Sequence, residues 1–309
     1  MPRIITLTPN PALDFSFEAD KVEPNQKLRC SNPRVDAGGG GVNVARAALR
    51  LSAQTLAIFT TGGLHGATLK EAVARENVPA RIIPVGGETR PAFHVRETSS
   101  GDEFRFNFPG AEMSDGEASL FLTALEEEAK SGDYIVASGS LPPGAPRDFW
   151  GRAARIAKSK GARFAIDSTK GVVEALEEGV DLLRLNKSEA PTFAGRSLQW
   201  PDDAANFAMD LVAKGKAGRV AITHGGEGGI LAGPSGVARA PSPDVKIVSA
   251  VGAGDSFVAA LVIALMKNEP DANALRFALA AASATLMTPG TALFEPKEVV
   301  RIYEASLRA

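Results

Sequence analysis

The sequence predicts an α/β protein: a doubly wound, mostly parallel sheet flanked by helices, with a small additional β-sheet. From residue 116 onward, short apolar runs typical of buried strands alternate with longer segments of helical period. Strands that are joined by helices run parallel, so this alternation indicates a parallel sheet. Earlier in the chain, residues 12–35 and 85–108 alternate polar and apolar side chains without a helical period, which is typical of strands in a separate sheet.

The elements can be placed in order from these patterns. Apolar runs bounded by turn residues predict buried strands at 4–7, 56–59, 134–138, 163–166, 182–185 and 220–223. Apolar residues at helical spacing predict helices at 42–49, 66–76, 116–130, 147–160, 202–214, 254–266, 273–286 and 296–306. A short antiparallel edge strand is expected at 230–232. We expect residues 1–309 to form one domain, because this length suffices for one large α/β unit.

Composition excludes several classes of protein. The net charge is −2, so no broad basic field favours a nucleic acid or an anionic membrane as partner. The single cysteine, Cys30, excludes a disulfide within the chain. Residues 1–9 lack the basic region and apolar core of a signal peptide, and the longest apolar runs are too short to cross a bilayer. A cytoplasmic location is therefore expected.

One stretch combines a glycine turn, a carboxylate and a helix. Gly252, Ala253 and Gly254 precede Asp255, and an apolar run of helical spacing follows. The free N–H groups and the helix dipole at such a turn form an anion site. The carboxylate can accept a proton from a bound hydroxyl, which suits phosphoryl transfer to an alcohol. The alternative is that Asp255 only caps the helix and that the glycines only form a tight turn.

A second glycine run, 38–41, also opens directly into a helix. It allows the backbone to approach a ligand closely, and Asn43, one turn later, can both donate and accept hydrogen bonds with a pair of sugar hydroxyls. The alternative is a flexible linker. The run is short, it contains no serine, and an amphipathic helix begins directly after it, all of which favour a binding turn.

Polar residues also mark the ends of the predicted strands. The carboxyl ends of parallel strands line one edge of a sheet, where ligands bind. These residues are Asp14, Ser138, Asp167, Asn186 and Thr223. In the small sheet, Arg90 and Arg105 could grip a phosphate; the alternative is two solvated arginines on a polar face. Phosphate-loop, dinucleotide-binding, G-x-S-x-G and metal-binding Cys/His patterns are absent from the sequence.

Taken together, these motifs resemble the ribokinase-like sugar kinases of the PfkB type. The resemblance rests on the stretches 251–256 and 38–46 and on Asn186-x-x-Glu189, and it extends from residues 8–14 to 288–291. It is closest to the phosphosugar branch, which includes the minor bacterial ATP-dependent 6-phosphofructokinases. The segments 27–30 and 138–144 and the four-glycine run indicate that branch.

The resemblance implies roles for individual residues in catalysis and in sugar binding. Asp255 is expected to be the catalytic base, with the amides of Gly252, Ala253 and Gly254 as the anion hole. Asp14, Gly38, Gly39 and Asn43 are expected to contact sugar hydroxyls. The sugar phosphate is expected to lie among Lys27, Arg29, Arg90, Arg105 and Ser138.

The resemblance also implies the sites of the nucleotide and of two cations. The expected nucleotide-binding residues are Arg184, Asn186, Thr223, Gly225, Gly226, Gly228, Leu279 and Ser283. Mg²⁺ is expected near Asn186 and Glu189 through water, and a potassium ion near Ser249, Val251, Thr285, Thr288 and Gly290. The small sheet is expected to act as a lid and as a homodimer interface. Two residues depart from the family pattern: Ala250 replaces a usual threonine, and Arg184 replaces a usual lysine.

The implied activity is ATP-dependent phosphorylation of fructose 6-phosphate at its C1 hydroxyl. The alternatives are a 1-phosphofructokinase, a tagatose-6-phosphate kinase or a non-enzymatic sugar-phosphate-binding regulator. The first two usually carry a lysine where this chain has Gly40, which favours fructose 6-phosphate. Lys27 and Arg29 lie two residues apart on a presumed strand, so both are expected to face the phosphate end of the sugar.

Overall fold

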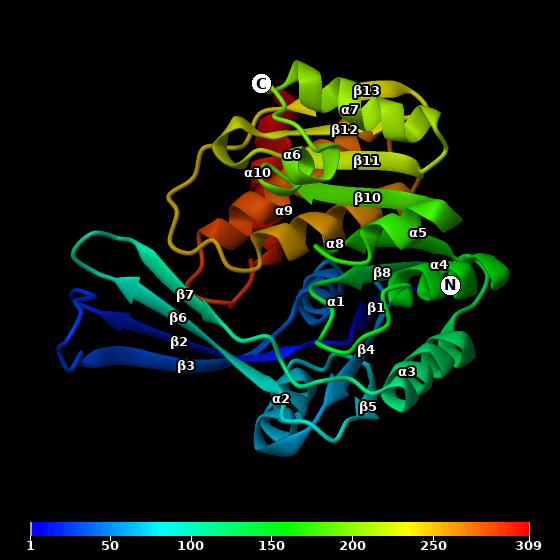
Figure 1. Ribbon diagram of the computed structural model, residues 1–309. Coiled ribbons are helices and arrows are strands. Elements are labelled where there is room, and N and C mark those ends of the chain that lie inside the picture. Colours follow the sequence, from blue (N-terminus) through cyan, green and yellow to red (C-terminus); the bar gives the residue numbers. More distant parts are fainter. Residues whose placement is uncertain (1, 309) are drawn as a thin grey trace.

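The computed structural model describes residues 2–308, and within them a large sheet forms the centre of the molecule (Figure 1). Its strand order is β13-β12-β11-β10-β9-β8-β1-β4-β5. The strands are β1 (Ile4–Thr8), β4 (Thr55–Thr61), β5 (Ala80–Pro84), β8 (Tyr134–Ser138), β9 (Arg163–Asp167), β10 (Val180–Asn186), β11 (Ala217–Thr223), β12 (Gly229–Gly233) and β13 (Gly236–Ala240). Pairing is parallel from β5 to β11 and antiparallel from β11 to β13.

Helices cover both faces of this sheet. They are α1 (Gly40–Arg50), α2 (Gly63–Arg75), α3 (Asp115–Glu128), α4 (Phe149–Ser159), α5 (Val172–Glu178), α6 (Glu189–Ala194), α7 (Asp202–Ala213), α8 (Ala253–Met266), α9 (Asp271–Leu286) and α10 (Pro296–Arg308). One apolar core joins the sheet to α3, α4, α5 and α7, and another joins it to α1, α8, α9 and α10. All five residues of β1 are buried, as expected for a central strand with helices on both sides. The predicted fold class is confirmed.

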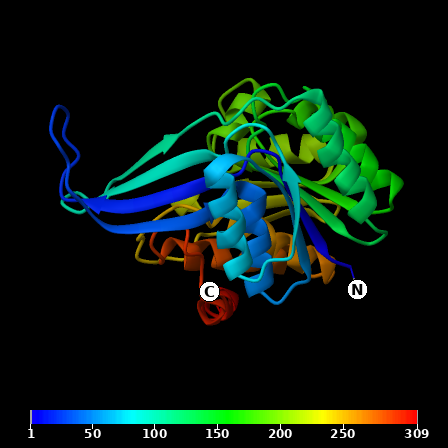
Figure 2. The ribbon, with the colours of Figure 1, turned by 90° about the horizontal axis from the view of Figure 1, so that it is seen from below.

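A small sheet extends from the large one at the carboxyl end of β1 (Figures 1 and 2). Its order is β3 (Cys30–Gly38), β2 (Ala12–Ala19), β6 (Arg90–Glu97) and β7 (Glu103–Asn107). Strands β2 and β6 pair in parallel, although about seventy residues separate them in the sequence. The expectation that the two alternating regions share one sheet is thus met.

Several predicted elements need correction. Residues 230–232 lie in the antiparallel strand β12, but β13 and not β12 forms the edge of the sheet. Strand β5, just before the predicted alternating region 85–108, was not predicted as a separate strand, and it pairs with β4 in the large sheet. Helices α5 and α6 were not predicted, because seven and six residues are too few to establish a helical period. In the described part of the chain, no helix is both long and apolar enough to cross a membrane.

Candidate active site

Asp255 lies in the first turn of α8 and points toward α1. The helix is capped by Gly252, whose φ of 78° is left-handed and therefore suits glycine. The carboxylate of Asp255 accepts a hydrogen bond from Nδ2 of Asn43 at 3.0 Å, and no side-chain cap bond is present at this helix end. The interpretation of Asp255 as a simple helix cap is therefore wrong.

Asn43 is held in one orientation by a buried arginine. Arg46 donates from Nη1 to Oδ1 of Asn43 at 2.9 Å and to the carbonyl of Ala37 at 3.0 Å. Its Nε donates to Glu76 at 2.8 Å. Because the amide oxygen of Asn43 is occupied by Arg46, the NH₂ group faces Asp255. Arg46 belongs to the stretch 38–46, but no role was predicted for it from the sequence. Its contact with Asn43 gains a role only because Asn43 also binds Asp255, which lies far away in the sequence.

The four-glycine run is a packed turn and not a flexible linker. At Gly38, a β-carbon would lie 2.2 Å from Oδ1 of Asp14, so only glycine allows that carboxylate to lie against the backbone. Gly39 then caps α1, and the amide of Asn43 donates to its carbonyl at 2.9 Å. The turn thereby brings Asp14, the glycine backbone and Asn43 together, as predicted for the sugar-hydroxyl site.

The surroundings of Asp255 raise its pKa from 3.8 to about 7. Burial among protein atoms is the main cause, because it disfavours the charged form, and repulsion from Asp167 adds to it. The hydrogen bond from Asn43 and the positive charge of Arg184 act in the opposite direction, and Asp14 adds a further upward effect. A carboxylate that titrates near neutral pH is well matched to accept a proton from an alcohol.

Arg184 connects the ends of three neighbouring strands. Its Nη1 donates to Asp167 at 3.1 Å, at the end of β9, and its Nη2 donates to Oγ1 of Thr223 at 2.9 Å, at the end of β11. Burial by itself would lower the pKa of Arg184. The attraction of the negative charges of Asp167, Glu189 and Asp255 outweighs burial, so the pKa is raised. Asp167 was predicted to lie at this edge, but no role was predicted for it. Its position as the last residue of a strand is the signal that could have indicated a role.

The raised pKa predicts the pH dependence of catalysis. Only the deprotonated carboxylate accepts a proton, so kcat/KM is expected to fall about tenfold per pH unit below about pH 7. Asp167→Asn removes the repulsion between Asp167 and Asp255 and frees Arg184 from its ion pair with Asp167. Both changes lower the pKa of Asp255, so the acid limb of the profile is expected to move to lower pH. Initial rates from pH 5 to 9 measure both profiles, and an acid limb that stays in place would contradict the assigned electrostatics.

A cavity of about 810 Å³ opens beside the first turn of α8. Gly254 and Ala253 line one side, and the turn η1 (Gly225–Glu227) and helix α9 line others. It includes the complete predicted nucleotide-binding set: Arg184, Asn186, Thr223, Gly225, Gly226, Gly228, Leu279 and Ser283. Arg105 of the small sheet also reaches it. The structure thus brings together residues that span a hundred positions of sequence.

Asn186 and Glu189 form a tight turn at the mouth of this cavity. Oδ1 of Asn186 accepts from the amides of Ser188 and Glu189, and Oε2 of Glu189 accepts from the amide of Asn186 at 2.9 Å. Within residues 2–308, no group of three or more His, Cys, Asp or Glu side chains is arranged to hold a metal. Mg²⁺ usually keeps several waters, so a turn that offers one further carboxylate oxygen fits water-mediated binding.

Arg90, at the start of β6, is a cation without an anionic partner. Its Nη1 donates to the carbonyl of Phe108 at 3.1 Å, and its Nε and Nη2 lie 3.5 Å from the carbonyl of Asn10. No carboxylate lies within 4.0 Å of it in the described part of the chain. Burial lowers the pKa of Arg90, and the negative charge of Asp14 opposes that shift. Asp14 is therefore near enough to both Arg90 and Asp255 for its charge to act on each of them.

The four other predicted phosphate ligands have different surroundings. Ser138 ends β8 and is 1% exposed, and its hydroxyl has no hydrogen-bond partner among residues 2–308. Arg105 forms an ion pair with Glu103 at 2.8 Å. Lys27 and Arg29 are not on a strand: they lie in the exposed loop between β2 and β3, at the end of the small sheet far from the large one (Figure 1). The prediction that they face the sugar is wrong for a single chain, because the alternation on which it relied ends at Ala19.

The residues predicted to bind potassium gather around the loops that flank α8 and α9. Val251 donates its amide to Oγ of Ser249 at 3.3 Å, and Thr288 donates its hydroxyl to the carbonyl of Thr285 at 2.8 Å. The hydroxyl of Thr285 is directed to Ser256 at 2.7 Å. Gly290 follows in the next turn. The backbone carbonyls of this set could serve a cation, and carbonyl oxygen is a ligand type that suits potassium.

Comparison with known proteins places the chain in a family. The sequence profile of the pfkB family carbohydrate kinases matches residues 11–298. The chain belongs to this family. The PfkB resemblance and the predicted class, a kinase acting on a carbohydrate, are therefore confirmed.

Individual pfkB relatives are similar over nearly the whole chain. The ATP-dependent 6-phosphofructokinase isozyme 2 of Escherichia coli (strain K12) is 37% identical over 308 residues, which cover 98% of each chain. The 1-phosphofructokinase of Bacillus subtilis (strain 168) is 30% identical over 283 residues, which cover 91% of this chain and 92% of that protein.

A solved structure supports the same family relationship. The crystal structure of phosphofructokinase-2 from Escherichia coli in complex with substrates and products matches with a TM-score of 0.95 and 36% identity, covering 99% of this chain and 100% of that one. Other crystal structures of that enzyme show a complex with potassium and a tetrameric inhibited form.

Proposed function

We propose that this pfkB kinase transfers the γ-phosphoryl group of ATP to the C1 hydroxyl of fructose 6-phosphate, forming fructose 1,6-bisphosphate and ADP. The observation that carries the proposal is Arg90, whose guanidinium rests on backbone carbonyls and has no carboxylate partner in the described chain. Such a group binds a phosphate through parallel charge-assisted hydrogen bonds. Arg90 does not line the cavity beside the first turn of α8, so a phosphate on Arg90 would leave the opposite end of the sugar for reaction at Asp255.

The chemistry requires one proton transfer and one phosphoryl transfer. Asp255 takes the proton of the C1 hydroxyl, the C1 oxygen bonds to the γ-phosphorus, and the bond from that phosphorus to the β–γ bridging oxygen breaks. The amides of Gly252, Ala253 and Gly254 hold the phosphoryl oxygens as their negative charge shifts. Arg184, at the wall of the nucleotide cavity, adds a fixed positive charge near Asp255.

Mg²⁺ and potassium complete the proposed site. Mg²⁺ would neutralise charge on the ATP phosphates, with Asn186 and Glu189 orienting its waters. The carbonyls near Ser249, Val251, Thr285, Thr288 and Gly290 would hold a potassium ion, in line with the potassium complex of the Escherichia coli enzyme. A cation there would support the loop that leads into Gly252.

Glu189→Gln is expected to raise the Mg²⁺ concentration needed for half-maximal activity about 10- to 100-fold. The reason is that a carboxylate that accepts hydrogen bonds from metal-bound waters orients those waters. Steady-state rates across an Mg²⁺ titration at saturating ATP measure the effect. Glu304→Gln, at an exposed position on α10, is the matched control. An Mg²⁺ titration that is identical in the two variants would remove Glu189 from the proposed role.

A coupled assay of ATP turnover separates the candidate functions. We expect kcat/KM to be higher for fructose 6-phosphate than for fructose 1-phosphate or tagatose 6-phosphate. A higher value for one of the other sugars would replace the substrate while leaving the kinase assignment intact. Sugar-phosphate binding without ATP turnover would instead support the regulator, although a regulator has little need of a base at position 255.

We also infer that two chains associate through the small sheet. The face opposite Asp14 exposes Val35, Phe106 and Phe108 to between 42% and 51%, and exposed apolar patches of this kind mark association surfaces. Light scattering is expected to report a dimer of the 32.2 kDa chain, or a larger assembly built from it. Phe106→Glu is expected to produce monomers, whereas Leu120→Glu on α3 is not. A monomeric wild-type protein would contradict the inference.

A further inference from the structure

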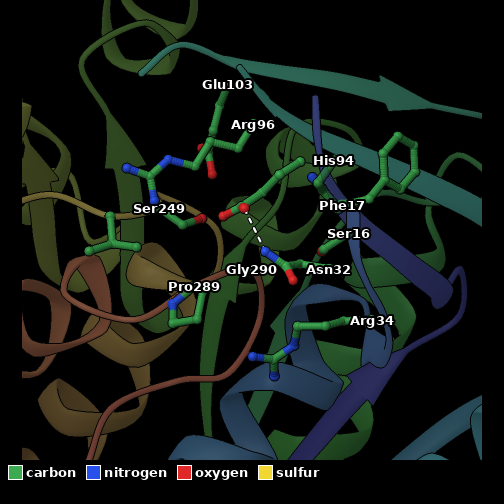
Figure 3. A pocket seen from close by; sticks show the side chains of 12 residues that line it. Ser16, Phe17, Asn32, Arg34, His94, Arg96, Glu103, Ser249, Pro289 and Gly290 are labelled. Atoms are coloured by element: carbon green, nitrogen blue, oxygen red, sulfur yellow. Dashed lines mark hydrogen bonds between the residues drawn. The ribbon is translucent and has the colours of Figure 1, made fainter. Parts of the chain in front are cut away.

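A second, smaller cavity lies beneath the outer half of the small sheet. It measures about 260 Å³, and the sheet covers it while the loops at 248–249 and 289–290 form its floor (Figure 3). It shares no lining residue with the nucleotide cavity, and Asp14, Gly39, Asn43 and Asp255 do not line it. The proposed sugar-phosphate and nucleotide positions therefore lie outside this cavity, although its floor includes Ser249 and Gly290 of the proposed potassium site.

Two buried polar side chains in its wall have no partner. Ser16 on β2 and His94 on β6 are each 8% exposed. The hydroxyl of Ser16 and both ring nitrogens of His94 lack a hydrogen-bond partner among residues 2–308. The carboxylate of Asp14 is 3.8 Å from Nε2 of His94, which is too far for a hydrogen bond. Buried polar groups without partners are costly, so their presence beside an open cavity indicates a polar ligand.

The two acidic residues that line the cavity, Glu18 and Glu103, are hydrogen-bonded to their neighbours, whereas Oδ2 of Asp36, close to Gly290, has no hydrogen-bond partner among residues 2–308. Glu18 accepts from Nδ2 of Asn32 at 2.7 Å. Glu103 accepts from Arg105 at 2.8 Å and from the amide of Ala250 at 3.3 Å. These carboxylates therefore leave little need for a cationic ligand.

The basic residues keep free donors. Arg96 on β6 has no carboxylate within 4.0 Å in the described part of the chain, and Arg34 on β3 approaches Asp36 only through Nε, at 3.5 Å. Figure 3 shows the side chains of Arg96 and Arg34 reaching toward the floor of the cavity from different strands. Among the side chains that line the cavity, the unused hydrogen-bonding capacity belongs mainly to donors, which are two guanidinium groups, a hydroxyl and a ring N–H of His94, and this favours an anion.

We propose that this cavity binds a small phosphate-type oxyanion, held by Arg96, Arg34 and Ser16. Arginine forks match the oxygens of a phosphate, and the serine hydroxyl adds a third donor. The volume exceeds that of a bare ion, so the ligand is inorganic phosphate with water or the phosphate group of a three-carbon metabolite.

A ligand in this position contacts both parts of the molecule. The arginines belong to the small sheet, whereas Ser249 and Gly290 belong to the loops beside α8, and the chain runs from Ser249 directly to the cap at Gly252. A ligand that bridges them favours the arrangement in which sheet and loops are together. Its binding and that of the sugar phosphate are therefore coupled, and each changes the affinity of the other by the same factor.

Calorimetric titration of inorganic phosphate and of glycerol 3-phosphate tests the proposal. The protein is first saturated with fructose 6-phosphate and a non-hydrolysable Mg-ATP analogue, so that the active-site phosphate positions, including that of the γ-phosphoryl group, are filled. We expect one-site binding of at least one of the two probes, and which probe binds identifies the source of the phosphate. Arg90→Ala reports on the sugar-phosphate position and is expected to leave this binding unchanged.

Arg96→Gln is expected to weaken the binding about tenfold or more, as for loss of a charge-assisted hydrogen bond. Arg301→Gln, at an exposed position on α10, is the matched control and is expected to bind as wild type does. Ser16→Ala removes only a hydroxyl and carries the test if Arg96→Gln does not fold. Equal affinities in Arg96→Gln, Ser16→Ala and the control, or no binding of either probe to the wild type, would overturn the proposal.

Discussion

Asp255→Asn is expected to lower kcat by about 10²- to 10⁴-fold while sugar-phosphate and ATP binding persist. The amide keeps the size of the side chain, but it cannot accept the proton of the attacking hydroxyl. Steady-state rates give kcat, and calorimetry gives the two dissociation constants. Turnover near the wild-type value would exclude Asp255 as the proton acceptor. Weaker binding of the substrates with an unchanged kcat would show instead that Asp255 serves in binding.

The same substitution is expected to stabilise the fold at neutral pH. The pKa of Asp255 rises from 3.8 to about 7 in the folded protein. The folded state therefore binds a proton more tightly than the unfolded chain, so stability decreases as the pH rises between these two values. A shift of about three units corresponds to at most about 4 kcal/mol above pH 7. Asparagine removes this cost, as is common where an active site trades stability for function.

Thermal melts at several pH values measure the stabilisation. The difference in Tm between Asp255→Asn and the wild type is expected to be largest above pH 7 and to disappear below about pH 4. Asp210→Asn, an exposed aspartate on α7 that pairs with Lys214, is the matched control. A difference that does not depend on pH would indicate a packing effect and not the titration of Asp255.

Arg90→Ala is expected to raise KM for the sugar phosphate with a much smaller effect on kcat. Truncating one partner of a buried, charge-assisted contact costs about 2–5 kcal/mol. At about 1.4 kcal/mol per factor of ten, the lower limit alone corresponds to roughly a 30-fold increase in KM. The KM for ATP is expected to remain near its wild-type value, because Arg90 does not line the nucleotide cavity.

Two further variants separate charge from structure at Arg90. The guanidinium also supports the carbonyls of Asn10 and Phe108, so Arg90→Lys retains the charge while it loses the fork. Partial recovery of KM is expected for lysine. Arg81→Ala, at an exposed position on β5, should behave as wild type. A variant in which KM for ATP rises instead would move Arg90 out of the sugar-phosphate site.

Arg184 links neighbouring strand ends at the wall of the nucleotide cavity. Its planar fork donates to Asp167 and to Thr223 at the same time, across the ends of three adjacent strands. A lysine has a single nitrogen on a flexible stem and does not hold this fixed geometry. The arginine therefore preserves the charge near Asp255 and adds rigidity to the wall of the nucleotide cavity.

The sequence alone determined the fold class and most of the site. Helical period, strand alternation and glycine turns are local patterns, so the helix at 253–266 and the turn at 38–41 were predicted close to their observed positions. The edge rule for parallel strands predicted that Asn186 and Thr223 lie at one edge, and the structure places both in one cavity together with the glycines after β11 that the resemblance implied. These inferences held because each depends on a short stretch of chain or on a general property of parallel sheets.

Only the tertiary structure decided which side chains touch Asp255 and what they do to it. The bond from Asn43 joins residues 212 positions apart, and the repulsion from Asp167 depends on β9 and α8 meeting at one edge. The same holds for Lys27 and Arg29, whose alternating surroundings suggested a strand although the chain forms a loop there. A local pattern specifies which way a side chain faces, whereas its partners, burial and pKa arise from segments that meet only when the chain has folded.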